Sequence, residues 1–250
     1  MEERISSRKN PLLQQVRRLL TSRKDREKTG LFVADGTKLL GEAVRWWPGL
    51  DTVVLSDGVE AEIPAGVRVV RVPEDVMASI SPMKAPQGAL FLCRMPEMGQ
   101  VELSGARYLV LDGLQDPGNV GTIWRTADAL GADGLLLVNG CADPWNHKTV
   151  RATMGAVFRS RPQWASHEAV AETCKAQGVP LCVTALSDRA VDVRQADLKK
   201  AALVIGSEGK GVGEYLLSRA DKELIIPMSE RCESLNAAIA AAIVLWEMKR

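Results

Sequence analysis

Five nearly continuous apolar runs in the second half of the chain constrain its fold more than any other feature. The runs are Tyr108–Leu111, Leu135–Val138, Pro180–Val183, Ala202–Ile205 and Leu224–Ile226. Strands buried on both faces of a parallel sheet have this composition, because crossover helices cover both faces and leave no polar side. We therefore predict an α/β fold with a parallel sheet, and we expect ligands to bind in the loops at the carboxyl ends of its strands.

The first ninety-odd residues have a different hydrophobic pattern, with shorter strand-like runs separated by helical segments. The runs are Leu31–Ala34, Thr52–Leu55, Val67–Val72 and Ala89–Cys93. Because 250 residues exceed the usual size of one domain, two domains are expected. A stretch with proline and glycines, Met95–Gly105, interrupts the pattern between them. We predict a smaller α/β domain over residues 1–97, a linker over 98–105 and a second domain over 106–250.

Positive charge is concentrated at the N-terminus, although the whole chain carries a net charge of only +1. Residues 1–28 contain nine basic and four acidic side chains. The apolar residues between Asn10 and Thr29 recur at helical spacing, which predicts one amphipathic basic helix. Such a helix could bind RNA phosphates, or it could be a solvated charged face.

Several familiar classes of site and location are disfavoured by the sequence. The five cysteines form no Cys-x-x-Cys pair, so neither disulfides nor a zinc or other metal site is expected. The N-terminus is charged, and no apolar run approaches the ~18 residues of a membrane span. We expect a cytoplasmic protein without a membrane partner.

Polar segments that could carry chemistry follow three of the predicted strands. The first, Asp112–Arg125, turns through Asp-Pro-Gly-Asn into a helix that we expect Asn119 to cap, with Arg125 on the face opposite the apolar residues. By itself this pattern also fits an ordinary capped helix with a solvated arginine.

The second segment, Gly206–Gly213, contains four glycines after a strand, so its backbone could approach a ligand closely or form a surface turn. Its spacing fits neither a P-loop nor a dinucleotide-binding fingerprint. The third segment, Ile225–Asn236, leads into a helix that is apolar on nearly every side and must be covered on more than one face. Ser234 is placed to cap that helix, with Asn236 in its first turn.

In order, spacing and residue types, Asn119–Arg125, Ile205–Gly213 and Ile226–Asn236 resemble the three motifs of the SpoU (TrmH-like) group of SPOUT RNA ribose methyltransferases. Lys148–Phe158 is similar to a further segment of that group. The resemblance implies S-adenosylmethionine as cofactor, an RNA ribose 2′-hydroxyl as acceptor, a trefoil knot in the sheet, and a homodimer that completes the active site. The N-terminal domain resembles the substrate-binding domain of ribosomal-RNA members, which favours 23S ribosomal RNA as the substrate.

The resemblance also assigns roles to individual residues. Its catalytic positions are Arg125, Asn119, Glu208, Ser234 and Asn236. Its cofactor-binding positions are Thr184, Leu186, Gly206, Ile226, Met228 and Leu235. A guanidinium stays protonated and is a poor base, so the arginine is better suited to anchor a phosphate and stabilise a developing alkoxide. The alternatives are a tRNA methyltransferase and a non-catalytic RNA-binding ribosome assembly factor, while a nucleotide-dependent oxidoreductase lacks its fingerprint.

Overall fold

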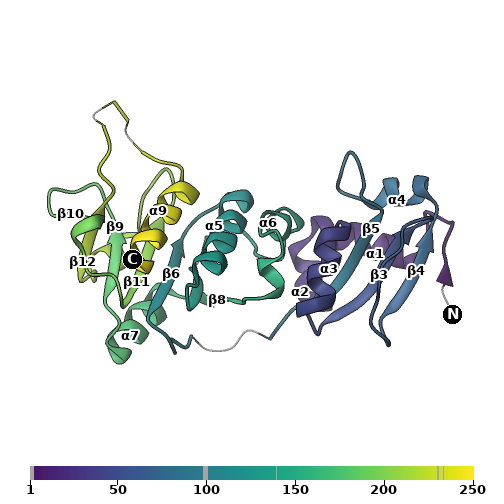
Figure 1. The fold of residues 1–250 in the computed structure, drawn as a ribbon, viewed down its shortest axis with the longest axis horizontal. Helices are drawn as coiled ribbons and strands as arrows, with labels where there is room; N and C mark the ends of the chain where they lie inside the picture. Colours follow the sequence, from purple (N-terminus) through teal and green to yellow (C-terminus); the bar gives the residue numbers. More distant parts are fainter. Residues whose placement is uncertain (1–2, 98–100, 139, 230, 233) are drawn as a thin grey trace. The chain divides into compact units, whose positions relative to one another are not determined.

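The computed structural model describes residues 3–97, 101–138, 140–229, 231–232 and 234–250. Its contacts divide the chain into two compact units (Figure 1). The first unit comprises Met1–Glu97 and Trp145–Arg159, and the second comprises Met98–Pro144 and Ser160–Arg250. The segment Trp145–Arg159 therefore packs with residues that precede it by about fifty positions or more in the chain.

A mixed five-stranded sheet forms the centre of the first unit, with strand order β1-β4-β3-β5-β2. The four strands predicted from the sequence are confirmed, and a two-residue strand at the N-terminus is added. The strands are β1 (Glu3–Arg4), β2 (Leu31–Asp35), β3 (Leu50–Ser56), β4 (Arg68–Val72) and β5 (Ala89–Arg94). β5 is antiparallel to both of its neighbours, β2 and β3, while β1, β4 and β3 run parallel.

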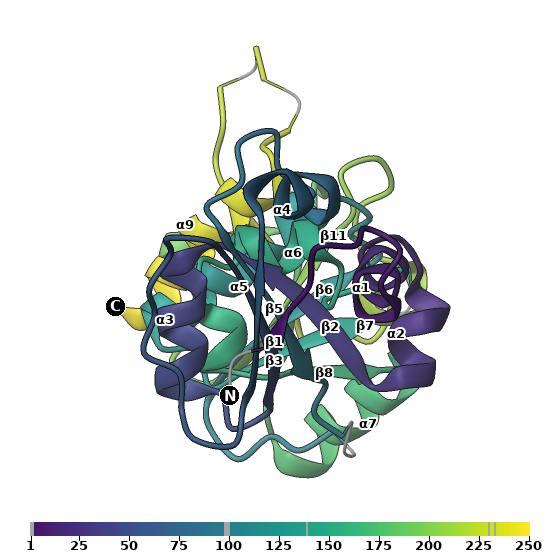
Figure 2. The same cartoon turned by 90° about the vertical axis from the view of Figure 1, so that its right-hand side faces the viewer.

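The prediction of one N-terminal helix is wrong, because Ser22 divides it. Ser22 is extended, and its side chain accepts a hydrogen bond from the amide of Asp25, so it caps a second helix. The helices of this unit are α1 (Pro11–Thr21), α2 (Arg23–Thr29), α3 (Thr37–Trp46), α4 (Glu74–Ile80) and α6 (His147–Ala152), with the 3₁₀ turn η1 (Ala156–Phe158). Figure 2 shows α3 and α1 on opposite sides of the sheet.

Alternate residues of β2 and β5 fill two separate cores on the two faces of this sheet. Val33 and Leu92 pack in an aliphatic core with residues of α1 and α4. Phe32 faces the other way, where its ring centroid lies 5.0 Å from Trp145 and 6.4 Å from Phe158. The segment Trp145–Phe158 thus completes an aromatic core on the α3 side of the sheet.

The second unit contains a seven-stranded sheet in which every pair is parallel, with order β10-β12-β9-β11-β6-β7-β8. The five apolar runs form its five interior strands, which confirms the predicted fold class. The strands are β6 (Arg107–Asp112), β7 (Gly134–Val138), β8 (Pro162–Ala165), β9 (Leu181–Thr184), β10 (Val191–Asp192), β11 (Ala201–Gly206) and β12 (Lys222–Ile225). The remaining elements are α5 (Pro117–Leu130), α7 (His167–Gln177), η2 (Val193–Gln195), α8 (Glu214–Leu217) and α9 (Ala237–Lys249).

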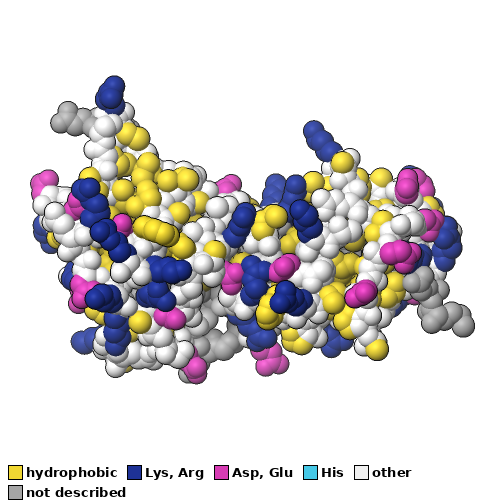
Figure 3. Space-filling view, in the orientation of Figure 1, with side chains coloured by type: hydrophobic (Ala, Val, Ile, Leu, Met, Phe, Trp, Pro, Cys, Tyr) yellow, Lys and Arg dark blue, Asp and Glu magenta, His cyan; other side chains and the backbone are white. Residues whose placement is uncertain are grey.

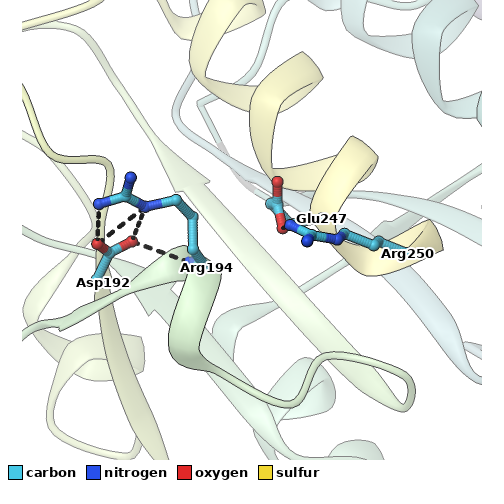
Figure 4. A network of polar contacts seen from close by, with 4 residues as sticks. All are labelled: Asp192, Arg194, Glu247 and Arg250. Atoms are coloured by element: carbon cyan, nitrogen blue, oxygen red, sulfur yellow. Dashed lines mark hydrogen bonds and ion pairs between the residues drawn. The ribbon is translucent and has the colours of Figure 1, made fainter.

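Parallel pairing brings the carboxyl ends of β6, β9, β11 and β12 to one edge of this sheet, so the loops that follow them meet there. Near the C-terminal end of α9, two charged pairs lie close to each other, Asp192 with Arg194 and Glu247 with Arg250 (Figure 4). Arg194 contacts Asp192 at 2.5 Å and lowers the pKa of that carboxyl through the hydrogen bond, while Glu247 pairs with Arg250 at 3.6 Å. The apolar helix therefore ends in a charged network.

Candidate functional site

The first turn of α5 differs from the sequence prediction, because Asp116 rather than Asn119 is its cap. The Oδ1 atom of Asp116 accepts a hydrogen bond from the backbone amide of Asn119 at 2.7 Å. Pro117 occupies the first helical position, where its missing N–H costs nothing, so the helix begins three residues earlier than expected. The side chain of Asn119 is consequently available for contacts outside its own helix.

The cap of α9 also differs from the prediction, because Asn236 takes the place expected for Ser234. The Oδ1 atom of Asn236 accepts hydrogen bonds from the amides of Ala238 at 2.9 Å and Ile239 at 3.3 Å. Its Nδ2 atom donates to Oδ1 of Asn119 at 3.1 Å. One amide group therefore starts the helix and contacts α5.

Asn119 connects this cap to the glycine loop, residues Gly206–Gly213. Its Nδ2 atom donates a hydrogen bond to Oε1 of Glu208. Two hydrogen bonds thereby connect one residue from each of the three sequence motifs, Asn119, Glu208 and Asn236. We call this group the Asn119 bridge. Since Asn236 uses its oxygen for the cap, only its nitrogen can face Asn119, and this orients the Asn119 nitrogen toward Glu208.

The glycine loop is folded tightly onto itself. Ser207 and Gly211 exchange two backbone hydrogen bonds of 3.1 and 2.9 Å. A Cβ atom at Gly206 would lie 2.0 Å from the carbonyl carbon of Gly211, so no other residue fits without moving the backbone. Gly211 has a φ of +67°, which glycine adopts without strain.

A cavity of about 620 Å³ lies at the carboxyl edge of the second sheet. It is bordered by the glycine loop and by the loops that follow β9 and β12. All six residues expected to bind cofactor line it, namely Thr184, Leu186, Gly206, Ile226, Met228 and Leu235. Two of the expected catalytic residues, Glu208 and Ser234, line it as well. The Asn119 bridge therefore connects to the cavity through Glu208.

One wall of the cavity contains a polar cluster that the sequence did not reveal. Glu223 on β12 is paired with Arg189 at 2.5 Å, and it accepts a hydrogen bond from Ser187. These contacts tie the loop after β9 to β12. Ser187 and Arg189 follow the predicted strand Pro180–Val183, which was the available signal, but Glu223 lies more than thirty positions farther along the chain.

Arg125 is the expected catalytic residue that stands apart from the others. It is exposed on α5, opposite the buried residues Val120, Ile123 and Trp124, as predicted. It lies six positions after Asn119, a distance of about 9 Å along the helix axis. It is not among the residues that line the cavity.

Most of the basic residues near the N-terminus have structural partners. Five of the nine are engaged: Arg4 with Asp57, Arg8 with Asp75, Arg17 with Ser79, Arg23 with Glu27, and the buried Arg26 with the carbonyl of Leu19. Four others are exposed, namely Lys9, Arg18, Lys24 and Lys28. These four are available for phosphate contacts, and Arg4, Arg8 and Arg23 are exposed as well but would have to exchange a carboxylate for the phosphate. Within the described residues, no cluster of metal-binding side chains is found, and no helix has the length and apolarity to cross a membrane.

Comparison with known proteins supplies the family. Residues 106–246 match the model of the SpoU rRNA Methylase family, and residues 10–90 match an MRM3-like substrate binding domain. The chain belongs to the SpoU rRNA methylase family. It is similar to 23S rRNA (guanosine(2553)-2′-O)-methyltransferase RlmP of Bacillus subtilis, with 34% identity over 251 residues and 99% of each chain covered.

Solved structures of SpoU relatives share the fold. An AdoMet-bound rRNA methyltransferase from Sinorhizobium meliloti superposes with a TM-score of 0.88 at 33% identity, covering 99% of this chain and 97% of the other. AviRb from Streptomyces viridochromogenes, also solved with AdoMet, gives a TM-score of 0.86 at 25% identity, covering 96% and 98% of the two chains.

Proposed function

We propose that this SpoU protein transfers a methyl group from S-adenosylmethionine to a ribose 2′-hydroxyl in 23S ribosomal RNA. The proposal rests on the cavity at the carboxyl edge of the second sheet. Residues of the second and third motifs line this cavity, and the Asn119 bridge connects the first motif to it. Family membership and the RlmP relative support the same reaction. A 23S rRNA substrate in turn favours a cytoplasmic enzyme.

The cavity suits S-adenosylmethionine in size and in chemistry. Its volume of about 620 Å³ is in the usual range for sites that enclose a small-molecule ligand. Ile226, Met228 and Leu235 offer apolar contacts for an adenine ring, and the backbone around Gly206 can approach a ligand without a side chain in the way. We assign the six cofactor positions to adenosine and methionine binding on this basis.

Bound S-adenosylmethionine supplies an electrophilic methyl group, so the chain's own side chains need only orient the RNA hydroxyl and help remove its proton. Glu208 lies at the cavity with its carboxylate held by Asn119, where it can accept a hydrogen bond from the substrate. Ser234 and Asn236 are close enough in the chain to bind the ribose or the neighbouring phosphate together. Arg125 does not line the cavity, which favours a contact with RNA rather than with the cofactor.

We propose that two chains form a homodimer through α9, and that Arg125 of each chain acts in an active site completed by the other. Ile239 and Trp246 on α9 are 54% and 62% exposed, although a helix of this composition requires cover on every face. Figure 3 shows apolar side chains gathered over this part of the second unit. α9 packs against α5, which carries Arg125, so an α9 interface would bring the two copies of α5 close together.

The dimer can be tested with one substitution and a matched control. Trp246→Glu should convert the protein to a monomer in light scattering and abolish methyl transfer. Trp46→Glu replaces another exposed tryptophan, 47% exposed in the first unit, and should leave the mass unchanged. A dimeric, active Trp246→Glu protein would rule out the α9 interface.

We also propose a trefoil knot in the second unit and separate roles for the two domains. β11 lies between β6 and β9 although it follows both in the chain, an order that a threaded C-terminal segment would produce. We assign RNA binding to residues 1–97, with 98–105 as linker and 106–250 as the methyltransferase domain; the family matches over 10–90 and 106–246 support this.

The function is tested by cofactor titration followed by methyl transfer. The protein should bind S-adenosylmethionine in calorimetry and methylate 23S rRNA, with the product mapped as a 2′-O-methyl nucleotide. Arg125→Ala should lose turnover while keeping cofactor affinity, because its side chain does not line the cavity. Absence of cofactor binding would favour a non-catalytic assembly factor, and methylation of tRNA alone would overturn the ribosomal assignment.

A further inference from the structure

One residue outside the expected site, Asp112, fixes both ends of the glycine loop. Asp112 is the last residue of β6 and is only 6% exposed. Its backbone pairs in register with Gly206, the residue at which the loop begins. Its Oδ2 atom accepts a hydrogen bond from the amide of Gly213 at 2.7 Å, at the other end of the loop.

A second group holds the carboxylate of Asp112 in this position. The Nε2 atom of His167, the first residue of α7, lies 2.9 Å from Oδ1. The approach at the loop is close, since a Cβ atom on Gly213 would lie 3.1 Å from Oδ2 and 3.7 Å from His167. Both carboxylate oxygens thus have protein partners, which suits a structural contact better than direct binding of a ligand.

We propose that Asp112 is a positioning residue for the cofactor, acting through the glycine loop. Residues Gly206–Val212 line the cavity, and Asp112 determines where this segment leaves the sheet and where it ends. The inference rests on the proposed use of that cavity for S-adenosylmethionine. If the Gly213 amide loses its partner, the loop must move or leave a polar group unsatisfied, and either change lowers cofactor affinity.

The same strand provides a matched control at its other end. Asp133 accepts hydrogen bonds from the amides of Ala106 and Arg107, each at 2.8 Å, where β6 begins. Asp133→Ala therefore removes carboxylate contacts to backbone amides beside β6 without touching the cavity. A general loss of stability should follow from either alanine substitution, whereas a specific loss of cofactor affinity should follow only from Asp112→Ala.

Calorimetric titration with S-adenosylmethionine and hydrogen–deuterium exchange of the full-length protein test the proposal. Asp112→Ala should raise Kd by about 10- to 100-fold, the cost of one unsatisfied, partly buried amide. It should also accelerate exchange in residues 206–213. Asp112→Asn keeps an oxygen for the Gly213 amide and should restore Kd to within about threefold of the parent. Asp133→Ala should change neither quantity.

An Asp112→Ala protein with unchanged Kd and unchanged loop exchange would overturn the proposal, as would an equal loss of affinity in Asp133→Ala. Should the parent protein not bind S-adenosylmethionine, the proposed function fails, while exchange in residues 206–213 still tests whether Asp112 holds the loop. If Asp112→Ala does not fold, His167→Ala removes the other support of the carboxylate. Faster loop exchange in that variant supports the positioning role, and unchanged exchange contradicts it.

Discussion

The amide of Asn236 performs two tasks that a pair of substitutions can separate. Its oxygen caps α9 by accepting from the amides of Ala238 and Ile239, and its nitrogen donates to Asn119. Asn236→Ala loses both contacts. Asn236→Asp keeps an oxygen for the cap but has no proton to donate to Asn119.

The expected magnitudes follow from these contacts. Loss of an asparagine cap costs about 1 kcal/mol of stability, so Asn236→Ala should unfold at lower denaturant concentration. The aspartate variant should match or slightly exceed the parent, because a negative charge at a helix N-terminus is favourable. Methyl transfer should fall in both variants. One lost neutral hydrogen bond of about 1 kcal/mol lowers kcat/KM about fivefold, and repulsion between the new carboxylate and Glu208 should add to the loss.

Chemical denaturation and initial rates of methyl transfer to RNA, measured on the same preparations, distinguish the two tasks. The decisive result is the aspartate variant, which should be stable and impaired. Full activity in that variant would refute the catalytic importance of the Asn119 bridge. Equal destabilisation by alanine and aspartate would refute the assigned cap. Combining Asn236→Asp with Asn119→Ala should cost little more than Asn119→Ala alone, since the contact that Asn236→Asp removes is already lost in Asn119→Ala.

Three further predictions concern the rest of the molecule. At pH 8 a thiol reagent should label Cys232 in the native protein but leave Cys174 and Cys182 unmodified, because burial raises the pKa of each of these two thiols to about 11; peptide mass spectrometry checks this. Burial lowers the pKa of His147 in the folded protein below its value in the unfolded chain. As the pH drops, the imidazole is therefore protonated more readily in the unfolded chain, and the free energy of unfolding should fall below about pH 6.5. The part of that slope due to His147 should disappear in His147→Asn, and an unchanged slope in urea titrations would contradict the assignment. Asp116→Ala should lose about 1 kcal/mol of stability while Asp116→Asn retains it, and equal losses in denaturation would argue against the cap.

The interior of the second sheet could be predicted from the sequence because burial on both faces leaves a signal in every residue. β8 and β10 left no such signal, and both lie at the edges of the sheet. β10 has two residues, and the central residues of β8, Gln163 and Trp164, are only partly buried. Edge strands are short and need only one neighbour, so their composition is not constrained toward apolar runs.

The helix caps were predicted less well, because each helix start offers more than one suitable acceptor. Asp116 and Asn119 both precede apolar helical residues, as do Ser234 and Asn236. Local propensity ranks these side chains as nearly equal. The choice depends on where Pro117 starts α5 and on which side chains are drawn to partners far away in the chain. Contacts such as Asn119 with Glu208 span 89 positions and have no local signature.

Packing of Trp145–Arg159 in the first unit could not be predicted for a related reason. The segment lies between β7 and β8 and has the sequence of an ordinary crossover. The segment packs where it does because Phe32 and Phe91 form an apolar surface on the α3 side of the first sheet. Trp145 and Phe158 cover this surface. Only the assembled sheet reveals that this face is uncovered.

The site residues gain their positions from the order of the strands rather than from their own loops. The glycine loop starts at the end of β11 and is fixed at both ends by Asp112 of β6, so its geometry exists only when β11 lies beside β6. β11 reaches that place between β6 and β9, after both have been synthesised. The cavity wall is therefore complete only when β11 lies between β6 and β9. It follows that a chain in which β11 has not inserted can have much of its secondary structure and still bind no cofactor. In a refolding experiment, S-adenosylmethionine binding should accordingly appear after the recovery of circular dichroism, and simultaneous recovery of the two signals would show that the strands assemble in one step.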